Sequence, residues 1–344
     1  MRFTKEAKSK AGGRTKSVRV LFSCVGRRIE LLEAFRRAGK ALRIGLEIHG
    51  ADASRLAPAL HRVDKAHIVP RIGSGEYVAA LLDIARRRKV DLLIPLLDAE
   101  LFAIASAVEA FEQVGCRALI SSHRVVAACR DKFTTYRALR DAGIDTPETW
   151  TWDEVVARER HRFPYFLKPR AGSAALGNYV VRSAEELQTF GRLVKDPIVQ
   201  EFVNGVEHTL DVYAGWDGVP RCVVPRKRLE VRNGEASKAL IVKDKAIMAV
   251  GRRVVEMFEE CRGVITVQCM VTSDRRIRVI EINPRFGGGA PLSIHAGADF
   301  PQWILLELLG RHPPIRATNF RDDVAMLRFD DSVFINRGSR LIRS

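Results

Sequence analysis

The first third of the chain alternates short apolar runs with segments whose apolar residues recur at helical spacing. The apolar runs predict strands at residues 18–24, 44–48, 66–69, 92–96 and 118–120, and the helical spacing predicts helices at residues 28–38, 75–87 and 99–114. Strands that alternate with helices are typical of a parallel sheet covered by helices on both faces. We therefore predict an α/β domain with a doubly wound parallel sheet over residues 17–128.

The turn that follows the first predicted strand carries one glycine, Gly26, before the first helix begins. A dinucleotide-binding turn needs three glycines at fixed spacing, for the tight turn and for close approach to the pyrophosphate. We therefore do not assign a nicotinamide cofactor to this domain.

Beyond residue 129 the pattern changes to fewer helices and more strands, several of them spaced as hairpins. The predicted helices span residues 131–142, 246–261 and 301–310, and the predicted strands span residues 163–168, 179–182, 198–202, 208–214, 221–225, 265–271 and 276–282. This mixture predicts α+β domains over residues 129–315, with a lid subdomain at about residues 150–199. Residues 316–344 form a C-terminal extension with a mobile end.

Composition excludes several classes of protein. The chain has 344 residues, of which 47% are hydrophobic and 28% charged, as in a folded globular protein of more than one unit. No run of about 18 apolar residues occurs, so we expect no membrane span. The six cysteines are scattered, which argues against zinc and disulfide frameworks and favours reduced thiols in the cytoplasm.

The formal charge of +16 is concentrated at the ends of the chain. The first 19 residues hold seven lysines and arginines against one glutamate. We expect residues 1–16 to form a basic disordered tail, and we expect no nucleic acid partner because no aromatic residues interleave with these charges. The remaining positive charge suits a polyanionic ligand.

The strongest local signal is a predicted hairpin of residues 265–271 and 277–283. If Asp274 and Arg275 form its turn, Gln268 lies directly opposite Glu281, and the two-residue period places Asn283 on the same face. Carboxylate and amide oxygens are ligands that Mg²⁺ prefers. An edge strand with Glu281 and Asn283 facing solvent would give the same pattern, but the motif from Pro284 to Gly289 follows at once and favours the metal site.

A second signal is Lys168 at the end of an apolar strand. A buried ammonium needs an anionic partner, and a phosphate is a natural one. The glycines and small residue that follow, Gly172, Ser173 and Gly177, allow backbone N–H groups to approach phosphate oxygens. The loop alone is a weak signal, and the lysine and the hairpin strengthen it.

A third element begins at Gln200. Its short apolar piece, Phe202 and Val203, has backbone groups suited to a purine edge, and Glu207 has oxygens suited to ribose hydroxyls. Glu207 and Asp211 share a strand face by parity. Ordinary hairpin carboxylates would give the same local pattern.

Further candidate substrate contacts lie on either side of the hairpin. Arg226 and Arg228 alternate on one strand face and would clamp a phosphate or an acceptor carboxylate, although a solvated basic strand fits the pattern equally well. Gly288 and His295 follow the metal strand and would border the acceptor pocket. For His295, packing on a helix face is the alternative.

Taken in order, these motifs resemble the ATP-grasp superfamily, most closely the large subunit of carbamoyl-phosphate synthetase and its single-cassette relatives. The resemblance covers roughly residues 17–314 and rests on Asp131-Lys132 with Thr134, Phe166-Leu-Lys-Pro169, Gln200-Glu-Phe-Val with Gly205-Val-Glu207, and Val267-Gln268 before Glu281-Ile-Asn-Pro-Arg285. This chain has one cassette and a less glycine-rich loop, so carbamoyl phosphate synthesis by this chain alone is not expected.

The resemblance implies roles for individual residues. Lys132 and Lys168 bind ATP phosphates, Glu201, Phe202 and Val203 line the adenine pocket, and Glu207 holds the ribose. Gln268, Glu281 and Asn283 position Mg²⁺, or Mn²⁺ in its place, and Arg285 stabilises an acyl phosphate. The resemblance also implies a homodimer.

The leading hypothesis is an ATP-dependent carboxylate–amine ligase with small-molecule substrates, in which Lys168 and Arg285 are the catalytic residues. Two alternatives belong to other classes. One is a phosphotransferase on the same fold, which would give a stable phosphorylated product. The other is a non-catalytic nucleotide-binding or nucleic-acid-associated protein, suggested by the basic tail.

Overall fold

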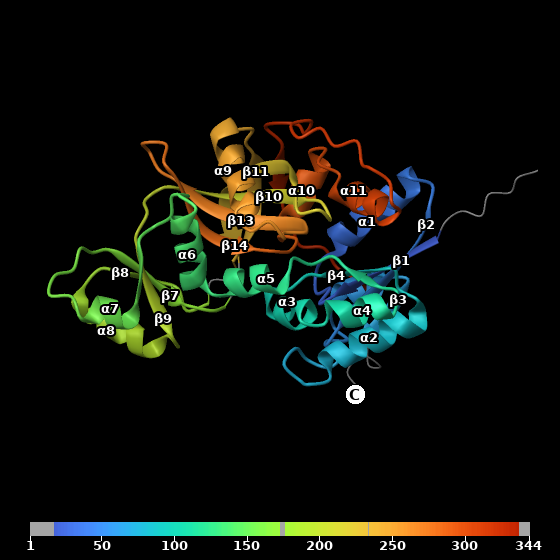
Figure 1. Ribbon diagram of the computed structural model, residues 1–344, viewed down its shortest axis with the longest axis horizontal. Helices are drawn as coiled ribbons and strands as arrows, with labels where there is room; N and C mark the ends of the chain where they lie inside the picture. The colour runs from blue at the N-terminus through green and yellow to red at the C-terminus, as the bar shows by residue number, and fades with distance from the viewer. Residues whose placement is uncertain (1–16, 173–175, 233, 337–344) are drawn as a thin grey trace, which may run out of the picture.

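The computed structural model describes residues 17–172, 176–232 and 234–336, which form three β-sheets with helices packed around them (Figure 1). The predicted disordered tail at residues 1–16 and the predicted mobile end at residues 337–344 lie outside the described residues. Within the described part of the chain, no helix combines the length and the apolar character needed to cross a bilayer.

The first sheet is parallel and five-stranded, in the order β3-β2-β1-β4-β5. Its strands are β1 (Ser17–Ser23), β2 (Gly45–Asp52), β3 (Lys65–Ile68), β4 (Leu92–Pro95) and β5 (Arg117–Ala118), and its helices are α1 (Ile29–Ala41), η1 (Pro58–Arg62), α2 (Tyr77–Arg88), α3 (Asp98–Ala105) and α4 (Val108–Gln113). Alternate residues of β1 point to opposite faces, so Val20 and Phe22 pack with α1 while Leu21 packs with α2. The predicted doubly wound α/β domain is confirmed.

One predicted helix is wrong. The segment 99–114 forms two helices, α3 and α4, which are separated at Ser106 and Ala107. The Ser106 hydroxyl donates a hydrogen bond to the carbonyl of Phe102 at 2.9 Å, and such bonds compete with helix propagation. A further helix that the sequence analysis missed, α5 (His123–Arg130), begins where the Ser122 hydroxyl accepts from the Val125 N–H.

The second sheet is six-stranded, in the order β14-β13-β10-β11-β12-β15. Its strands are β10 (Val206–Ala214), β11 (Pro220–Arg232), β12 (Glu235–Ile241), β13 (Gly263–Val271), β14 (Ile277–Asn283) and β15 (Ala325–Leu327), and its helices are α6 (Lys132–Asp141), α9 (Lys245–Glu256), α10 (Ala290–His295) and α11 (Phe300–Leu308). All pairings in this sheet are antiparallel.

Two predictions for this region are wrong, and two strands were missed. The strand predicted to end at Pro225 continues to Arg232, because the polar run after Pro225 pairs with β12, a strand that the sequence analysis missed. The helix predicted to reach residue 261 ends at Glu256. No strand was predicted within the C-terminal extension, residues 316–344, yet β15 lies there and hydrogen-bonds to β12 at the edge of the sheet.

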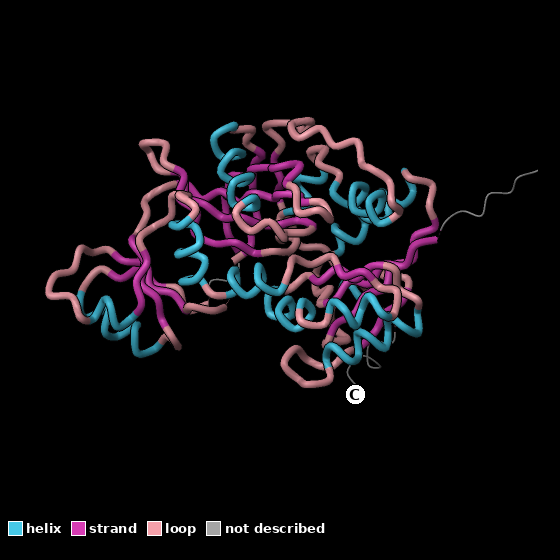
Figure 2. The backbone as a smooth tube through the Cα atoms, in the orientation of Figure 1, coloured by secondary structure: helices cyan, strands magenta, loops and turns pink. Residues whose placement is uncertain are grey.

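The third sheet lies apart from the other two at one end of the molecule (Figure 2). Its strands β6 (Thr149–Thr151), β7 (Tyr165–Pro169), β8 (Tyr179–Val181) and β9 (Pro197–Glu201) have the order β6-β9-β7-β8, and it carries helices α7 (Trp152–Val156) and α8 (Ala184–Leu193). Seven buried residues give it a core of its own: Val155, Tyr165, Leu167, Val181, Leu187, Val194 and Val199. This sheet corresponds to the segment that the sequence analysis predicts as a lid.

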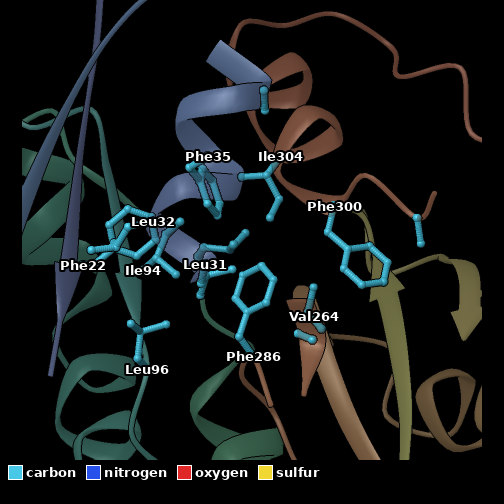
Figure 3. Close-up of a cluster of buried hydrophobic side chains, with 14 of the residues drawn as sticks. Phe22, Leu31, Leu32, Phe35, Ile94, Leu96, Val264, Phe286, Phe300 and Ile304 are labelled. Carbon is cyan, nitrogen blue, oxygen red and sulfur yellow. The ribbon is translucent and has the colours of Figure 1, made fainter. Parts of the chain in front are cut away.

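The first and second sheets share one hydrophobic core. Helix α1 packs on one side against the parallel sheet and on the other against α10 and α11. Figure 3 shows Phe286, from the segment after β14, between Leu31 of α1 and Val264 of β13. The rings of Phe286 and Phe35 meet edge to face, with their centroids 6.2 Å apart. The N-terminal domain is therefore fixed on the second sheet by apolar packing.

The position of Phe286 leads to a stability prediction. Phe286→Ala should lower the free energy of unfolding by about 3–5 kcal/mol, because it opens a cavity in the core that joins the two sheets. Urea unfolding followed by tryptophan fluorescence measures the loss. The control is Phe329→Ala, whose ring is 84% exposed and whose removal should change stability by less than about 0.5 kcal/mol. Equal unfolding midpoints for the two variants would contradict the shared core.

Candidate active site

One face of the second sheet is polar along four neighbouring strands. Alternate residues of β10, such as Leu210 and Val212, pack into the core beneath α9. The intervening positions carry polar side chains on the opposite face, which the two-residue period of a strand requires. The polar set is Glu207, Thr209, Asp211, Arg226, Arg228, Thr266, Gln268, Glu281 and Asn283.

The predicted pairing of Gln268 with Glu281 is confirmed, but the route to it differs from the prediction. Five residues, 272–276, separate the two strands; the Thr272 N–H donates to the Arg276 carbonyl at 3.0 Å, and Arg275 has a φ of 66°. A bulge at Ile280 then restores the register before Glu281. The bulge also directs the Ile280 carbonyl toward Lys168, whose Nζ lies 3.4 Å away.

The three predicted metal ligands meet on the polar face. Asn283 Nδ2 lies 3.3 Å from Gln268 Oε1 and 3.1 Å from Glu281 Oε1. Among the described residues, no group of three histidine, cysteine, aspartate or glutamate side chains is placed to hold a metal. The trio with one carboxylate and two amides is a set of oxygen donors that fits Mg²⁺, which keeps several waters and takes further oxygens from substrate phosphates.

Lys168 is a buried ammonium group close to this trio. Its side chain is 4% exposed and its Nζ donates to Gln200 Oε1 at 3.1 Å. Burial lowers the pKa of Lys168 to about 8, the charge of Glu281 opposes this shift, and the charge of Lys132 adds to it. Lys132, Lys168 and Glu281 therefore lie within electrostatic range of one another.

Lys132 contacts the loop that follows Lys168. Its Nζ donates to the carbonyl of Gly172 at 2.7 Å, and its backbone N–H donates to the carbonyl of Arg170. Asp131 caps α6 and pairs with Arg170 at 2.6 Å. Although burial opposes the shift, the hydrogen bond from Arg170 holds the pKa of Asp131 below its usual value.

The predicted phosphate loop is only partly described. Gly172 and Gly177 have φ values of +137° and +74°, which favour glycine at both positions. Ser173 lies outside the described residues.

The predicted adenine-binding residues lie at the end of β9. The Glu201 carboxylate forms two hydrogen bonds of 2.7 Å with Arg278, and this guanidinium lowers the pKa of Glu201. Phe202 is exposed and Val203 is half-buried directly after the strand. Because the Glu201 carboxylate is already paired with Arg278, the polar groups that this segment can offer to a ligand are its backbone N–H and C=O groups.

Glu207 is held from two sides. Gln268 Nε2 donates to Glu207 Oε1 at 2.8 Å, and Arg228 forms an ion pair with the same oxygen. Glu207 is thereby connected through Gln268 to the trio of predicted metal ligands.

Arg226 and Arg228 do not form a solvated basic strand. The side chain of Arg226 is 1% exposed, and it binds Asp211 through Nε at 2.8 Å and Nη2 at 2.9 Å. Ser293 donates a further hydrogen bond of 2.6 Å to Asp211. The side chain of Arg228 is 7% exposed. Charged side chains that are buried this deeply need oppositely charged partners. The carboxylates of Asp211 and Glu207 supply them, which accounts for the charged residues on this face of the sheet.

A cavity of about 70 Å³ lies beside the metal trio, and we name it the arginine cavity. It is lined by Arg28, Thr209, Arg226, Arg228, Gly234, Glu235, Ala236, Thr266, Gln268, Arg285, Gly287, Gly288 and Gly289. Two of these glycines, Gly288 and Gly289, lie close against charged side chains. A Cβ on Gly288 would lie 2.5 Å from the Glu235 carboxylate carbon, and one on Gly289 would lie 2.1 Å from Arg226 Nη1.

The substrate prediction for His295 is not supported by its position. Its exposed side chain lines a different cavity, between α1 and the start of α11, together with Glu30, Arg37 and Asp299. The chain turns at Gly289 into the short helix α10, which carries His295 away from the arginine cavity.

The sequence analysis missed four residues of the site, because their partners are distant in the chain: Arg28, Asp98, Glu235 and Arg328. Arg285 pairs with Asp98 of α3 at 2.6 Å. Arg28, from the turn after β1, lies 3.2 Å from Glu235, which also accepts from Arg328 at 2.8 Å. The N-terminal domain therefore supplies charged groups to a site built on the second sheet.

The packing of Gly289 leads to a second prediction. Gly289→Ala should destabilise the protein by about 1–3 kcal/mol, because Arg226 is fixed by Asp211 and has no room to yield. Gly75→Ala is the matched control, since open space surrounds that glycine and its φ is not positive. Thermal unfolding compares the two variants, and an unchanged midpoint for Gly289→Ala would show that Arg226 is mobile.

Comparison with protein families identifies both halves of the chain. Residues 129–289 match the profile of an ATP-grasp domain. Residues 20–119 match the profile of a PylC-like N-terminal domain. The matched segments contain the second sheet's polar face and the parallel sheet that carries Arg28 and Asp98.

Curated relatives are similar at low identity. A formate-dependent phosphoribosylglycinamide formyltransferase from Ignicoccus hospitalis is 25% identical over 71% of this chain and 64% of its own length. A D-alanine–D-alanine ligase from Aquifex aeolicus is 25% identical over 44% of this chain, and the chain spans only 57% of its length. A 3-methyl-D-ornithine–L-lysine ligase from Methanosarcina acetivorans is 24% identical over 81% of this chain and 70% of its length.

Solved structures share the fold. The ADP complex of an N5-carboxyaminoimidazole ribonucleotide synthetase superimposes with a TM-score of 0.71 at 17% identity, over 91% of this chain and 81% of that one. An L-amino acid ligase from Bacillus licheniformis gives a TM-score of 0.66 at 17% identity, over 85% and 74% of the two chains. The two family matches confirm the predicted ATP-grasp resemblance at the level of the superfamily: the chain contains an ATP-grasp domain preceded by a PylC-like N-terminal domain.

Proposed function

We propose that this protein is an ATP- and Mg²⁺-dependent carboxylate–amine ligase that releases ADP and phosphate. The observation that carries the proposal is the convergence of two lysines, Lys132 and Lys168, with the oxygen-donor trio on one polar sheet face. The arginine cavity adjoins this face through Gln268. Nucleotide phosphates and a second substrate would therefore meet at one place.

The reaction proceeds in two transfers. A carboxylate oxygen of the first substrate attacks the γ-phosphorus of ATP, and the bond to the ADP oxygen breaks. The nitrogen of an amine then attacks the acyl carbon, phosphate leaves with the bridging oxygen, and the amine loses a proton to solvent. Lys132 and Lys168 offset the charge of the ATP phosphates, and Arg285 lies beside the arginine cavity to stabilise the acyl phosphate.

The metal would be held by Gln268, Glu281 and Asn283, whose oxygens suit Mg²⁺ and also Mn²⁺. When bound, it neutralises developing charge on the phosphate oxygens. For the nucleoside, we assign the backbone of Glu201, Phe202 and Val203 to the adenine edge. Both protein hydrogen bonds to Glu207 fall on Oε1, so we assign Oε2 to a ribose hydroxyl.

The names of the relatives favour a ligase over a phosphotransferase. Two of the three relatives described above are named as ligases that join two amino acids or amino acid derivatives. We accordingly assign a small-molecule carboxylate and a small-molecule amine as substrates. The homodimer and the cytoplasmic location stay predictions.

The proposal is tested by magnesium-dependent release of ADP and phosphate from ATP in the presence of pooled amino acids and other small carboxylates. Glu281→Ala should lower the rate at least about 100-fold, because it removes the carboxylate of the metal trio. Glu256→Ala, on the exposed face of α9, is the matched control and should keep full activity.

Each outcome of that assay has a definite meaning. Phosphate release that needs both a carboxylate and an amine supports the ligase. A stable phosphorylated product with no amine requirement would replace it with a kinase. Full activity of Glu281→Ala, with an unchanged circular dichroism spectrum, would refute the metal assignment.

The lowered pKa of Lys168 predicts a proton linked to ATP binding. At pH 8 about half of the Lys168 side chains are neutral in the free protein, and the ATP phosphates favour the charged form. Binding should therefore take up about 0.5 proton at pH 8, and ATP affinity should be full below this pH and fall as the pH rises above it.

Isothermal titration calorimetry in two buffers of different ionisation enthalpy measures this proton. Lys168→Met keeps an apolar stem in the same place and should abolish the uptake. An uptake that persists in Lys168→Met would assign the proton to another group.

A further inference from the structure

The walls of the arginine cavity are rich in guanidinium groups. Four guanidinium groups, those of Arg28, Arg226, Arg228 and Arg285, line it against one carboxylate, that of Glu235. Guanidinium groups present planar sets of N–H donors that match carboxylate and phosphate oxygens. A wall of this kind favours an oxyanion over a neutral or a cationic group.

The protein's own carboxylates neutralise these arginines unequally. Arg226 is fully paired, because Asp211 accepts from both its Nε and its Nη2. Glu235 is shared by Arg28 and Arg328, so one carboxylate serves two guanidinium groups. Arg228 pairs with Glu207 and Arg285 pairs with Asp98. With Arg328 included, five guanidinium groups therefore share four carboxylates, and one positive charge remains beside the cavity.

Two donors in the wall have no partner. Arg228 Nε and Arg285 Nε are buried and make no hydrogen bond with any of the described residues. The side chain of Arg228 is only 7% exposed. A buried donor without an acceptor destabilises the folded protein. Both arginines line the same cavity, so these unpaired N–H groups add to the positive potential beside it.

The size of the cavity limits what enters it. Its volume of about 70 Å³ is several times the roughly 10–15 Å³ that one water needs on the same measure, so the cavity has room for a carboxylate or phosphate group. Gln268 belongs both to the cavity wall and to the metal trio, so a group bound here belongs to a molecule that reaches the reaction centre.

We propose that the arginine cavity binds a carboxylate or phosphate group on the non-reacting part of a ligase substrate, and so selects anionic substrates. The proposal rests on the ligase function proposed above and names the class of its substrate. Arg28, from the N-terminal domain, is then a specificity-determining residue. Glu235 is the wall carboxylate that forms an ion pair with Arg28, and its negative charge lowers the affinity of the cavity for anions.

The experiment uses matched pairs of probes that differ in one anionic group. These are L-aspartate with L-asparagine, L-glutamate with L-glutamine, and O-phospho-L-serine with L-serine, together with L-lysine as a cation. Calorimetry measures binding of each probe to the full chain loaded with Mg²⁺ and a non-hydrolysable ATP analogue. In separate assays with ATP, phosphate release measures turnover. At least one anionic probe should bind about tenfold or more tightly than its neutral partner. The carboxylate and phosphate pairs decide which oxyanion the cavity takes.

Variants of the wall should act in opposite directions. Arg28→Gln should weaken binding of the anionic probe about tenfold, Arg28→Lys should recover part of it, and Glu235→Gln should tighten it. Arg232→Gln is the matched control, since this arginine is exposed at the far end of β11 and should leave binding unchanged. Affinity for the ATP analogue should stay the same in Arg28→Gln, because the cavity serves the second substrate.

The outcomes separate this proposal from the ligase function. If the ATP analogue does not bind the unmodified protein, the ligase function itself fails. If the analogue binds but L-lysine or the neutral probes bind as well as the anionic ones, or if no anionic probe binds, the anion-selective cavity is overturned. Loss of ATP analogue affinity in Arg28→Gln would also overturn it, by assigning the arginines to the nucleotide phosphates.

Discussion

The arrangement of the site depends on one constraint: each buried charged side chain on the polar face of the second sheet needs a partner of opposite charge. The buried Arg226–Asp211 pair lies at the centre of the second sheet, where an unpaired charge would destabilise the protein by several kcal/mol. Ser293 satisfies a further lone pair of Asp211, and Gly289 lets the guanidinium lie against the backbone. The remaining polar groups of the sheet face are arranged around this fixed pair.

The N-terminal domain is part of the site as well as a neighbour of it. Its apolar contact through α1 places Arg28 and Asp98 beside the residues of the second sheet. Hydrophobic packing supplies the attachment because it is roughly proportional to area, whereas the ion pairs across the junction are partly exposed and contribute orientation more than stability. Separation of the two domains would leave the arginine cavity without one wall.

Local patterns in the sequence were sufficient for much of this arrangement. The predicted pairing of Gln268 with Glu281 is correct although the assumed turn is not, because the bulge at Ile280 offsets the changed turn by one residue. The bulge at Ile280 could not be predicted, since no glycine or proline marks it. The pairing of Arg285 with Asp98 joins segments far apart in the chain, so it depends on the tertiary fold and leaves no periodic signal.

The third sheet differs from the N-terminal domain in how it is attached. Its apolar residues form a core of their own, separate from the core that the other two sheets share. The contacts that tie it to the remainder include polar ones, namely Asp131 with Arg170, Lys132 with Gly172 and Glu201 with Arg278. Polar contacts of this kind exchange readily with water. The proposed nucleotide site therefore lies between a sheet attached through polar contacts and a sheet fixed to the N-terminal domain by apolar packing, and the arginine cavity is built on the fixed sheet.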